Sequence, residues 1–397
     1  MRATGETCRG GIARVALAAA AVVCALAAAS SVAAESPPWP KTKPPQRIWQ
    51  AVLDGSELDP VLFDVAADGS AVVGETRATD GKRIIAFTWL DRDGAIRRRA
   101  TVAEAVIGSP QWIALQPDGR ILLATLRARD TSFGELHMVA LDLSANVAYD
   151  RLPWLPPQPP GGAVFPGFAR APLASADGGA LFAPSLSNPA PAYGFYLERM
   201  DATGRSIWRA RFDAGLQRGR SHQLLDLRFL GGGEVALLYV RDQAFALRRY
   251  GLQGAPAGAV TVFGSAVKDR DIACGAVLDA RTIVTLEGPG AEFVTDTKLF
   301  VLAWHGAGKG KLREQRLVLD QARPANCRLF AMDAGGAVLS EAGLGVVRLD
   351  AKGTALWSLE RTTDLRAAPG MVTTLDAAGE GEARRLTVTR YADKAAD

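Results

Sequence analysis

Histidine, cysteine and long hydrophobic segments are scarce in this sequence of 397 residues, which has three histidines and four cysteines. His137, His222 and His305 lie far apart and form no close-spaced metal-binding pair, so no metal site is predicted. A Gly-x-Ser-x-Gly motif is absent, which argues against the nucleophile of an α/β-hydrolase. The common catalytic signatures are therefore missing.

An excess of charge of one sign is also missing. The sequence has 46 Lys and Arg against 42 Asp and Glu, a formal net charge of +4. This charge falls to +2 without residues 1–34, which hold three arginines and one glutamate. Nucleic-acid binding requires concentrated positive charge, so we expect no nucleic-acid partner.

The first 34 residues have the pattern of a secretory signal peptide. Three arginines precede an apolar stretch over 15–26, and small residues follow up to Ala34. A retained membrane anchor is the alternative, but the stretch is Ala-rich and only weakly hydrophobic. We expect a Pro-rich spacer over 35–46 and one exported domain over 47–397, periplasmic or extracellular, with no membrane span after cleavage.

One pattern recurs through this domain: two strands joined by a tight turn with Asp or Gly, a loop, then two further strands joined by a second turn. Asp and Gly relieve the strain of such hairpins, and the flanking runs are rich in Val, Leu, Ile and Phe. A four-stranded unit of about 50 residues is typical of a propeller blade. The first turn starts at Asp68, Asp118, Asp177, Gly231, Asp279 and Asp333. We predict an all-β fold, a β-propeller of about seven four-stranded blades.

The two ends of the domain complement each other. Arg384–Tyr391 has the pattern of a third strand, and no fourth strand follows it. Ile48–Asp54 matches Ile207–Asp213, the outer strand of an earlier unit. The N-terminal strand is therefore expected to close the last blade, which also removes a sheet edge. The inner strand of that blade is hard to place near residues 371–375, so six or eight blades remain possible.

Two segments, Met200–Trp208 and Leu349–Trp357, resemble the tryptophan-docking repeat of pyrroloquinoline-quinone-like propellers. The resemblance implies that Trp49, Trp208 and Trp357 pack between blades. Quinoprotein dehydrogenases of this kind bind the quinone and calcium and often carry adjacent cysteines, which this chain lacks. We expect no cofactor, with pyrroloquinoline quinone or calcium as the alternative.

Cys274 and Cys327 are the two cysteines outside the signal, and they lie 53 residues apart. This separation is one repeat, which places both near the start of inner strands in adjacent units. The Cα atoms could then approach within the range of a disulfide, which an exported protein can form. We predict that they are bonded; two buried free thiols are the alternative.

Polar residues cluster before the expected inner strands, where they would form one mouth of the central channel. Converging arginines there would bind a carboxylate, phosphate or sulfate group. The alternative is that they are solvated loop residues, held apart by the ring or paired with Asp. The predicted ligand-binding residues are Arg170, Arg220, His222, Arg270, Asp271, Arg323, Asn326 and Arg366.

These observations favour an exported, monomeric binding or scaffold protein without catalysis, whose partner is a protein or a small anionic ligand or glycan. An enzyme with its site at the channel mouth is the alternative, either a quinone-linked oxidoreductase or a lyase or hydrolase acting on an anionic glycan. A structural surface protein is a third reading. The fold alone does not decide, because propellers host all three.

Cleavage after Ala34 is directly testable. Protein exported to a periplasm should begin at Glu35, and its intact mass should be two hydrogens below that of the reduced chain. Intact mass spectrometry before and after reduction measures both quantities. Purified protein that keeps residues 1–34 would contradict cleavage and support the anchor.

Overall fold

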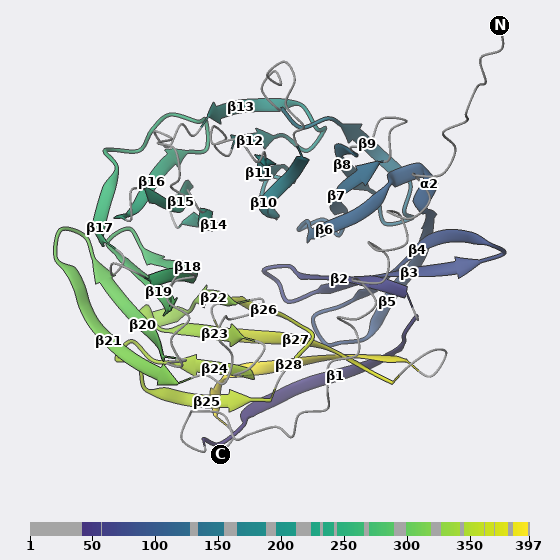
Figure 1. The fold of residues 1–397 in the computed structure, drawn as a ribbon. Helices are drawn as coiled ribbons and strands as arrows, with labels where there is room; N and C mark the ends of the chain where they lie inside the picture. Colours follow the sequence, from purple (N-terminus) through teal and green to yellow (C-terminus); the bar gives the residue numbers. More distant parts are fainter. Residues whose placement is uncertain are drawn as a thin grey trace, which may run out of the picture. The chain divides into compact units, whose positions relative to one another are not determined.

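The computed structural model describes residues 42–56, 58–127, 134–154, 165–187, 196–211, 224–230, 233–241, 244–265, 270–289, 299–318, 327–341, 345–360, 362–368, 370–379 and 384–395. Their strands form seven antiparallel sheets of four strands each, arranged around one axis as a seven-bladed β-propeller (Figure 1). Helix in this described part is limited to α2 (Glu104–Ile107) and the 3-10 turn η1 (Asp333–Gly335). None of it is long and apolar enough to cross a membrane.

The blades are numbered in chain order, and the strands of each are given from the axis outward. Blade 1 contains β2 (Leu58–Val65), β3 (Ala71–Thr79), β4 (Lys82–Leu90) and β5 (Ile96–Ala103); blade 2 contains β6 (Ser109–Leu115), β7 (Ile121–Arg127), β8 (Glu135–Leu141) and β9 (Val147–Arg151). Blade 3 contains β10 (Phe165–Ala174), β11 (Ala180–Ser187), β12 (Tyr196–Met200) and β13 (Ser206–Arg211); blade 4 contains β14 (Leu224–Leu230), β15 (Glu234–Arg241), β16 (Ala244–Gly251) and β17 (Thr261–Ser265). Blade 5 contains β18 (Arg270–Asp279), β19 (Thr282–Pro289), β20 (Leu299–Gly306) and β21 (Gly310–Val318); blade 6 contains β22 (Arg328–Ala331), β23 (Ala337–Glu341), β24 (Gly345–Leu349) and β25 (Ala355–Leu359). Blade 7 contains β26 (Asp364–Ala368), β27 (Met371–Ala378), β28 (Arg385–Ala395) and β1 (Pro45–Asp54).

Blade 7 joins the two ends of the domain, as the sequence predicted. Its outer strand β1 pairs antiparallel with β28, with Leu53 opposite Leu386 and Asp54 opposite Arg385. The inner strand that the sequence left unplaced is β26, and Met371 starts the second strand. The prediction of seven blades closed by the N-terminal strand is confirmed, and the alternatives of six or eight are excluded.

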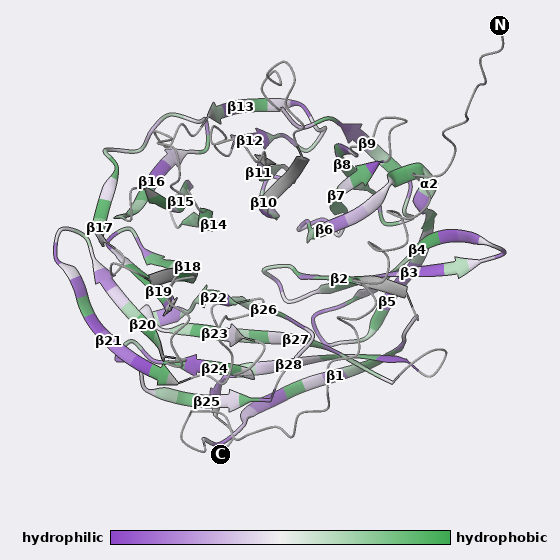
Figure 2. Ribbon diagram, viewed as in Figure 1, coloured by the Kyte–Doolittle hydropathy of each residue, from purple (hydrophilic) through white to green (hydrophobic). Residues whose placement is uncertain are grey.

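Burial follows the position of a strand within its blade. Every residue of β12 and β24, which are third strands, is buried, because both faces of a middle strand are covered by neighbouring blades. Most of β5, an outer strand, is exposed. Figure 2 shows hydrophilic stretches along another outer strand, β21. Middle strands are therefore buried along their length, ion-paired charges such as Glu198 and Arg199 included, whereas outer strands are largely exposed.

The second hairpin of several blades is fixed by an aspartate. In blade 3 the Oδ1 atom of Asp201 accepts hydrogen bonds from the backbone N–H groups of Thr203 (2.8 Å) and Arg205 (3.0 Å). Gly204 completes the turn at a φ of +81°, in the left-handed region that favours glycine. The recurring Asp-x-x-Gly signal thus specifies a turn.

The glycines that complete the second hairpins of blades 3 and 4 lie directly under an aromatic ring of the preceding blade. A Cβ atom on Gly204 would lie 2.6 Å from the ring of Tyr149, and one on Gly254 would lie 2.6 Å from Trp208. The indole of Trp208 also donates a hydrogen bond to Leu252 O (2.9 Å), and that of Trp49 donates to Arg92 O (2.8 Å). The packing role that the resemblance implied is therefore seen at Trp49 and Trp208.

This packing predicts unequal costs for two glycine substitutions. Gly204→Ala should destabilise the protein by about 1–3 kcal/mol more than Gly81→Ala, because only Gly204 has a ring against it. Gly81 is the matched control, since it also has a positive φ (+71°) and nothing lies within 4 Å of its added Cβ. Urea unfolding measures both free energies. Equal losses would show that backbone strain alone requires the glycine.

Candidate functional site

The inner strands of all seven blades line one central cavity of about 470 Å³. This volume lies in the range of small-molecule sites, roughly 300–1,000 Å³. The lining is mainly apolar, with Ile113, Leu173, Leu227 and Leu329 among its residues. The charged residues of the lining are Asp64, Arg170, Asp226, Arg228, Arg328 and Arg366. An apolar cavity with few charged groups is the usual form of a ligand site.

One set of charged residues connects blades 7, 1 and 2. Arg366 of β26 donates through Nη2 to Phe63 O (2.6 Å) and through Nε to Asp64 Oδ1 (3.0 Å), both on β2. Asp64 in turn accepts a hydrogen bond from the backbone N–H of Leu115 on β6 (2.7 Å). The Arg366–Asp64 pair therefore joins three inner strands that share no sheet.

An equivalent set connects blades 3, 4 and 5. Arg170 of β10 donates through Nη2 to Leu225 O (2.6 Å), the carbonyl just before Asp226. Asp226 accepts from the backbone N–H of Val277 on β18 (2.8 Å), and Arg228 donates to Val277 O (2.5 Å). Arg170 is thus equivalent to Arg366, since each donates to a carbonyl of the next blade, and Asp226 is equivalent to Asp64, since each accepts a backbone N–H of the blade after it.

The remaining junctions have their own bridges. The side-chain amide of Gln116 in blade 2 donates to Gly178 O in blade 3 (2.7 Å). Arg328 of blade 6 pairs with Asp364 of blade 7. Together with the sets above and the disulfide between blades 5 and 6 described next, these bridges connect every pair of neighbouring blades near the axis.

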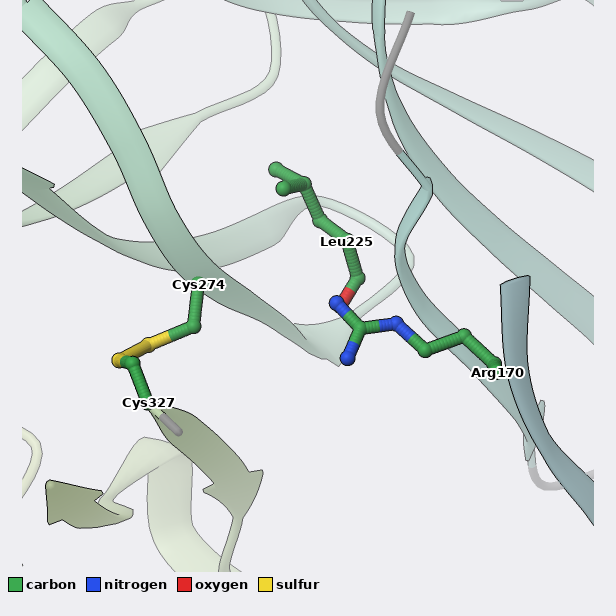
Figure 3. Close-up of a disulfide and its surroundings, with 4 residues drawn as sticks. All are labelled: Arg170, Leu225, Cys274 and Cys327. Atoms are coloured by element: carbon green, nitrogen blue, oxygen red, sulfur yellow. A yellow bond between two sulfur atoms is a disulfide. The ribbon is translucent and has the colours of Figure 1, made fainter. Parts of the chain in front are cut away.

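The disulfide joins blades 5 and 6, as predicted. Cys274 of β18 and Cys327, which precedes β22, are bonded with their Cα atoms 5.7 Å apart, and both line the cavity. Figure 3 shows this bond in the same region as Arg170, whose guanidinium meets the carbonyl of Leu225. The alternative of two free thiols is therefore wrong.

Burial dominates the electrostatics of the cavity carboxyls. It raises the pKa of Asp64 and of Asp226 above the ordinary range, although the guanidinium groups of Arg366 and Arg228, respectively, act in the opposite direction. Burial alone would lower the pKa of Arg366, but Asp364 and Asp64 raise it. Arg366 is therefore a cation held in place by two carboxylates.

The positive charges of Arg170 and Arg328 have less compensation from carboxylates than that of Arg366. Burial lowers the pKa of Arg170; the positive charge of Arg328 lowers it further, while Asp226 acts against this. Burial likewise lowers the pKa of Arg328, with Asp364 opposing and Arg366 adding to the effect. Within this one cavity, the charge of Arg366 thus lowers the pKa of Arg328, and the charge of Arg328 lowers the pKa of Arg170.

Two of the eight predicted ligand-binding residues are described with their side chains. Arg170 and Arg366 both line the cavity and lie within inner strands rather than before them. Arg270 and Asp271 belong to β18, but their side chains are outside the description. The other four, Arg220, His222, Arg323 and Asn326, lie outside the described residues. Ligand binding by these eight stays a prediction.

Sequence reasoning missed Asp64, Asp226, Arg228 and Arg328. A signal was available at the two aspartates, because each is a lone acidic residue in an otherwise apolar stretch, Val61–Val65 and Leu224–Leu227. Arg328 follows Cys327 directly and could have been placed beside the predicted disulfide.

The two described histidines lie away from the cavity. His305 is buried with Thr285 (3.0 Å from Nε2 to Oγ1) and Glu287, and His137 is paired with Asp150 (2.7 Å). Across the described ranges, no group of three His, Cys, Asp or Glu side chains has a geometry that could hold a metal ion.

No protein-family model matches this sequence. No curated protein is significantly similar to it either. Among solved structures the chain resembles prolyl oligopeptidase B from Galerina marginata (11% identity, TM-score 0.46), covering 84% of this chain but only 46% of that protein. It also resembles polysaccharide lyase Uly1 (10%, TM-score 0.46, 87% and 91% covered) and the α-L-arabinanase of Penicillium chrysogenum (12%, TM-score 0.43, 89% and 99% covered). Likeness at this level says nothing about a ligand or a reaction.

The raised pKa of Asp226 predicts a pH-dependent stability. The folded state binds this proton more tightly than the unfolded state, so its contribution is fully present below about pH 3.9 and is lost as the pH rises through the folded pKa. Asp226→Asn does not titrate. Relative to the wild type, its free energy of unfolding should therefore improve as the pH rises from about 4.

Urea unfolding of both proteins over a pH series measures this difference. A difference that moves the other way would show that Arg228 and Arg170 lower the pKa of Asp226 instead.

Proposed function

We propose that this protein is a non-catalytic binding protein, and that its central cavity takes a small ligand with an anionic group and an apolar body. The observation that carries the proposal is the pair Arg170 and Arg328: both line one apolar cavity, and the charge of Arg328 lowers the pKa of Arg170. An anion placed near both would reduce their mutual repulsion and gain charge-assisted hydrogen bonds.

Unused hydrogen-bonding capacity supports this assignment. The described contacts of Arg170 use its Nε and Nη2 atoms, toward Leu224 O and Leu225 O, and leave Nη1 without a protein partner among them. Arg328 pairs with Asp364 through Nη1, and a third of its side chain is exposed. Both guanidinium groups can therefore donate to a ligand while they hold the blades.

The apolar lining determines the rest of the ligand. Ile113, Leu173, Leu227, Leu329 and Phe330 surround the charged groups. A free inorganic anion would leave this surface unused, whereas an aryl or alkyl group would cover it and gain about 25 cal/mol per Å² of apolar surface buried. A carboxylate, phosphate or sulfate ester with an apolar substituent is the class that fits.

The enzymatic alternative, a quinone-linked oxidoreductase or a lyase or hydrolase acting on an anionic glycan, would draw on Asp64 and Asp226, the described carboxyls of the cavity lining. Each already accepts a backbone N–H of the next blade and faces an arginine. Such paired carboxylates do not suit a calcium site, which needs several oxygen ligands free to converge. The described groups therefore favour binding over catalysis.

Calorimetric titration with phenylacetate and its uncharged analogue phenylacetamide tests the proposal, with octanoate and phenyl phosphate as further anionic probes. Arg328→Gln should weaken phenylacetate binding about 10- to 100-fold, the effect of one charge-assisted hydrogen bond, and leave phenylacetamide unchanged. Arg97→Gln on the exposed outer strand β5 is the control, since it makes the same change in net charge far from the cavity.

Equal binding of phenylacetate and phenylacetamide, or equal losses in the two variants, would contradict an anion site at Arg328. Failure of all three anionic probes to bind at about 10 mM would contradict the proposed function as a whole.

A further inference from the structure

The lining of the central cavity reaches beyond the inner strand in blade 7. In the other six blades the described lining comes from the inner strand, the turn that follows it and, in blade 6, Cys327 just before the strand. In blade 7 the lining extends to Met371 and Thr373 of the second strand β27. The inner strand contributes the small side chains of Ala367 and Ala368 there.

Thr373 brings an unused polar group into this part of the lining. Its residue is 1% exposed, and its Oγ1 atom has no hydrogen-bond partner. A buried hydroxyl without a partner costs free energy, so such groups are rare in folded proteins. By contrast, the hydroxyl of Thr285, on the second strand of blade 5, contacts Glu287 (3.2 Å) and His305 (3.0 Å).

The charges beside Thr373 are already paired. Thr373 lies opposite Arg366 in the β26–β27 register, so the two side chains share a face of the blade. Arg366 donates to Asp64, Asp364, Phe63 O and Leu365 O. The blade 7 part of the lining therefore offers one unpartnered hydroxyl beside an arginine that is already paired, which suits an uncharged polar group.

We propose that Thr373 is a specificity-determining residue that hydrogen-bonds a hydroxyl group of the ligand, while the ligand's anionic group lies at Arg170 and Arg328. This inference rests on the proposed function and narrows the ligand class to hydroxylated anions with an apolar body. The lining supplies a cationic region and a neutral hydrogen-bonding position within one cavity, and a ligand with both groups uses both.

The test compares phenylacetate with 3-hydroxyphenylacetate and 4-hydroxyphenylacetate by calorimetric titration. The wild type should bind one hydroxylated probe about five- to tenfold more tightly than phenylacetate, the effect of one neutral hydrogen bond. Thr373→Val keeps the shape of the side chain and removes the hydroxyl. It should abolish this advantage and leave the affinity for phenylacetate unchanged.

Thr125→Val is the matched control. Thr125 also lies on a second strand, is fully buried and has an Oγ1 atom without a partner, but it does not line the cavity. Its variant should keep the hydroxyl advantage. Both variants should fold with wild-type stability or better, because each removes a hydroxyl that has no bond to lose.

The outcomes separate the two proposals. If phenylacetate binding depends on Arg328 but the hydroxyl advantage is absent or survives in Thr373→Val, the inference about Thr373 is wrong and the proposed function stands. If none of these carboxylates binds, the inference fails, and if octanoate and phenyl phosphate do not bind either, the proposed function fails with it. If both threonine variants lose the advantage, the effect comes from general loosening of the blades and the assignment to Thr373 is overturned.

Discussion

Neighbouring inner strands of this propeller converge on one axis, yet no sheet continues from one blade into the next. The backbone groups of these strands that face a neighbouring blade therefore need partners from side chains, because unpaired buried N–H and C=O groups are costly. The ring depends on the bridges between its blades. At five of the seven junctions a side chain bonds a backbone group: Asp64–Leu115, Gln116–Gly178, Arg170–Leu225, Asp226–Val277 and Arg366–Phe63. At the other two the bridge joins two side chains, Cys274–Cys327 and Arg328–Asp364.

The bridges also set the chemistry of the cavity. A charge buried near the axis loses hydration, and it is stable only where bonds and opposite charges compensate. Arg366 has such compensation from Asp64 and Asp364, whereas the charge of Arg328 adds to burial in lowering the pKa of Arg170. A structural requirement thus leaves more arginines than aspartates in the lining of an apolar cavity, which is the physical basis for the anionic ligand that we propose.

Local signals in the sequence predicted much of the fold. The Asp-x-x-Gly turns and the apolar runs between them gave the blade, and the match of Ile48–Asp54 to an earlier outer strand gave the closure by β1. The spacing of Cys274 and Cys327 gave the disulfide. In the candidate site, Arg170 and Arg366 were found but Asp64, Asp226 and Arg328 were not. The partners of Asp64 are 51 and 302 residues away, so no local pattern reveals them.

The sequence by itself determined the blade, its repetition, the closing strand and the covalent bond, because each depends on hairpin geometry or on a spacing of one repeat. Only the tertiary structure decided what the charged residues do. An arginine before a turn has the same local pattern whether it faces solvent or crosses to the next blade. Its partners become neighbours only when the ring closes, and the same closure brings Thr373 and the arginines into one cavity.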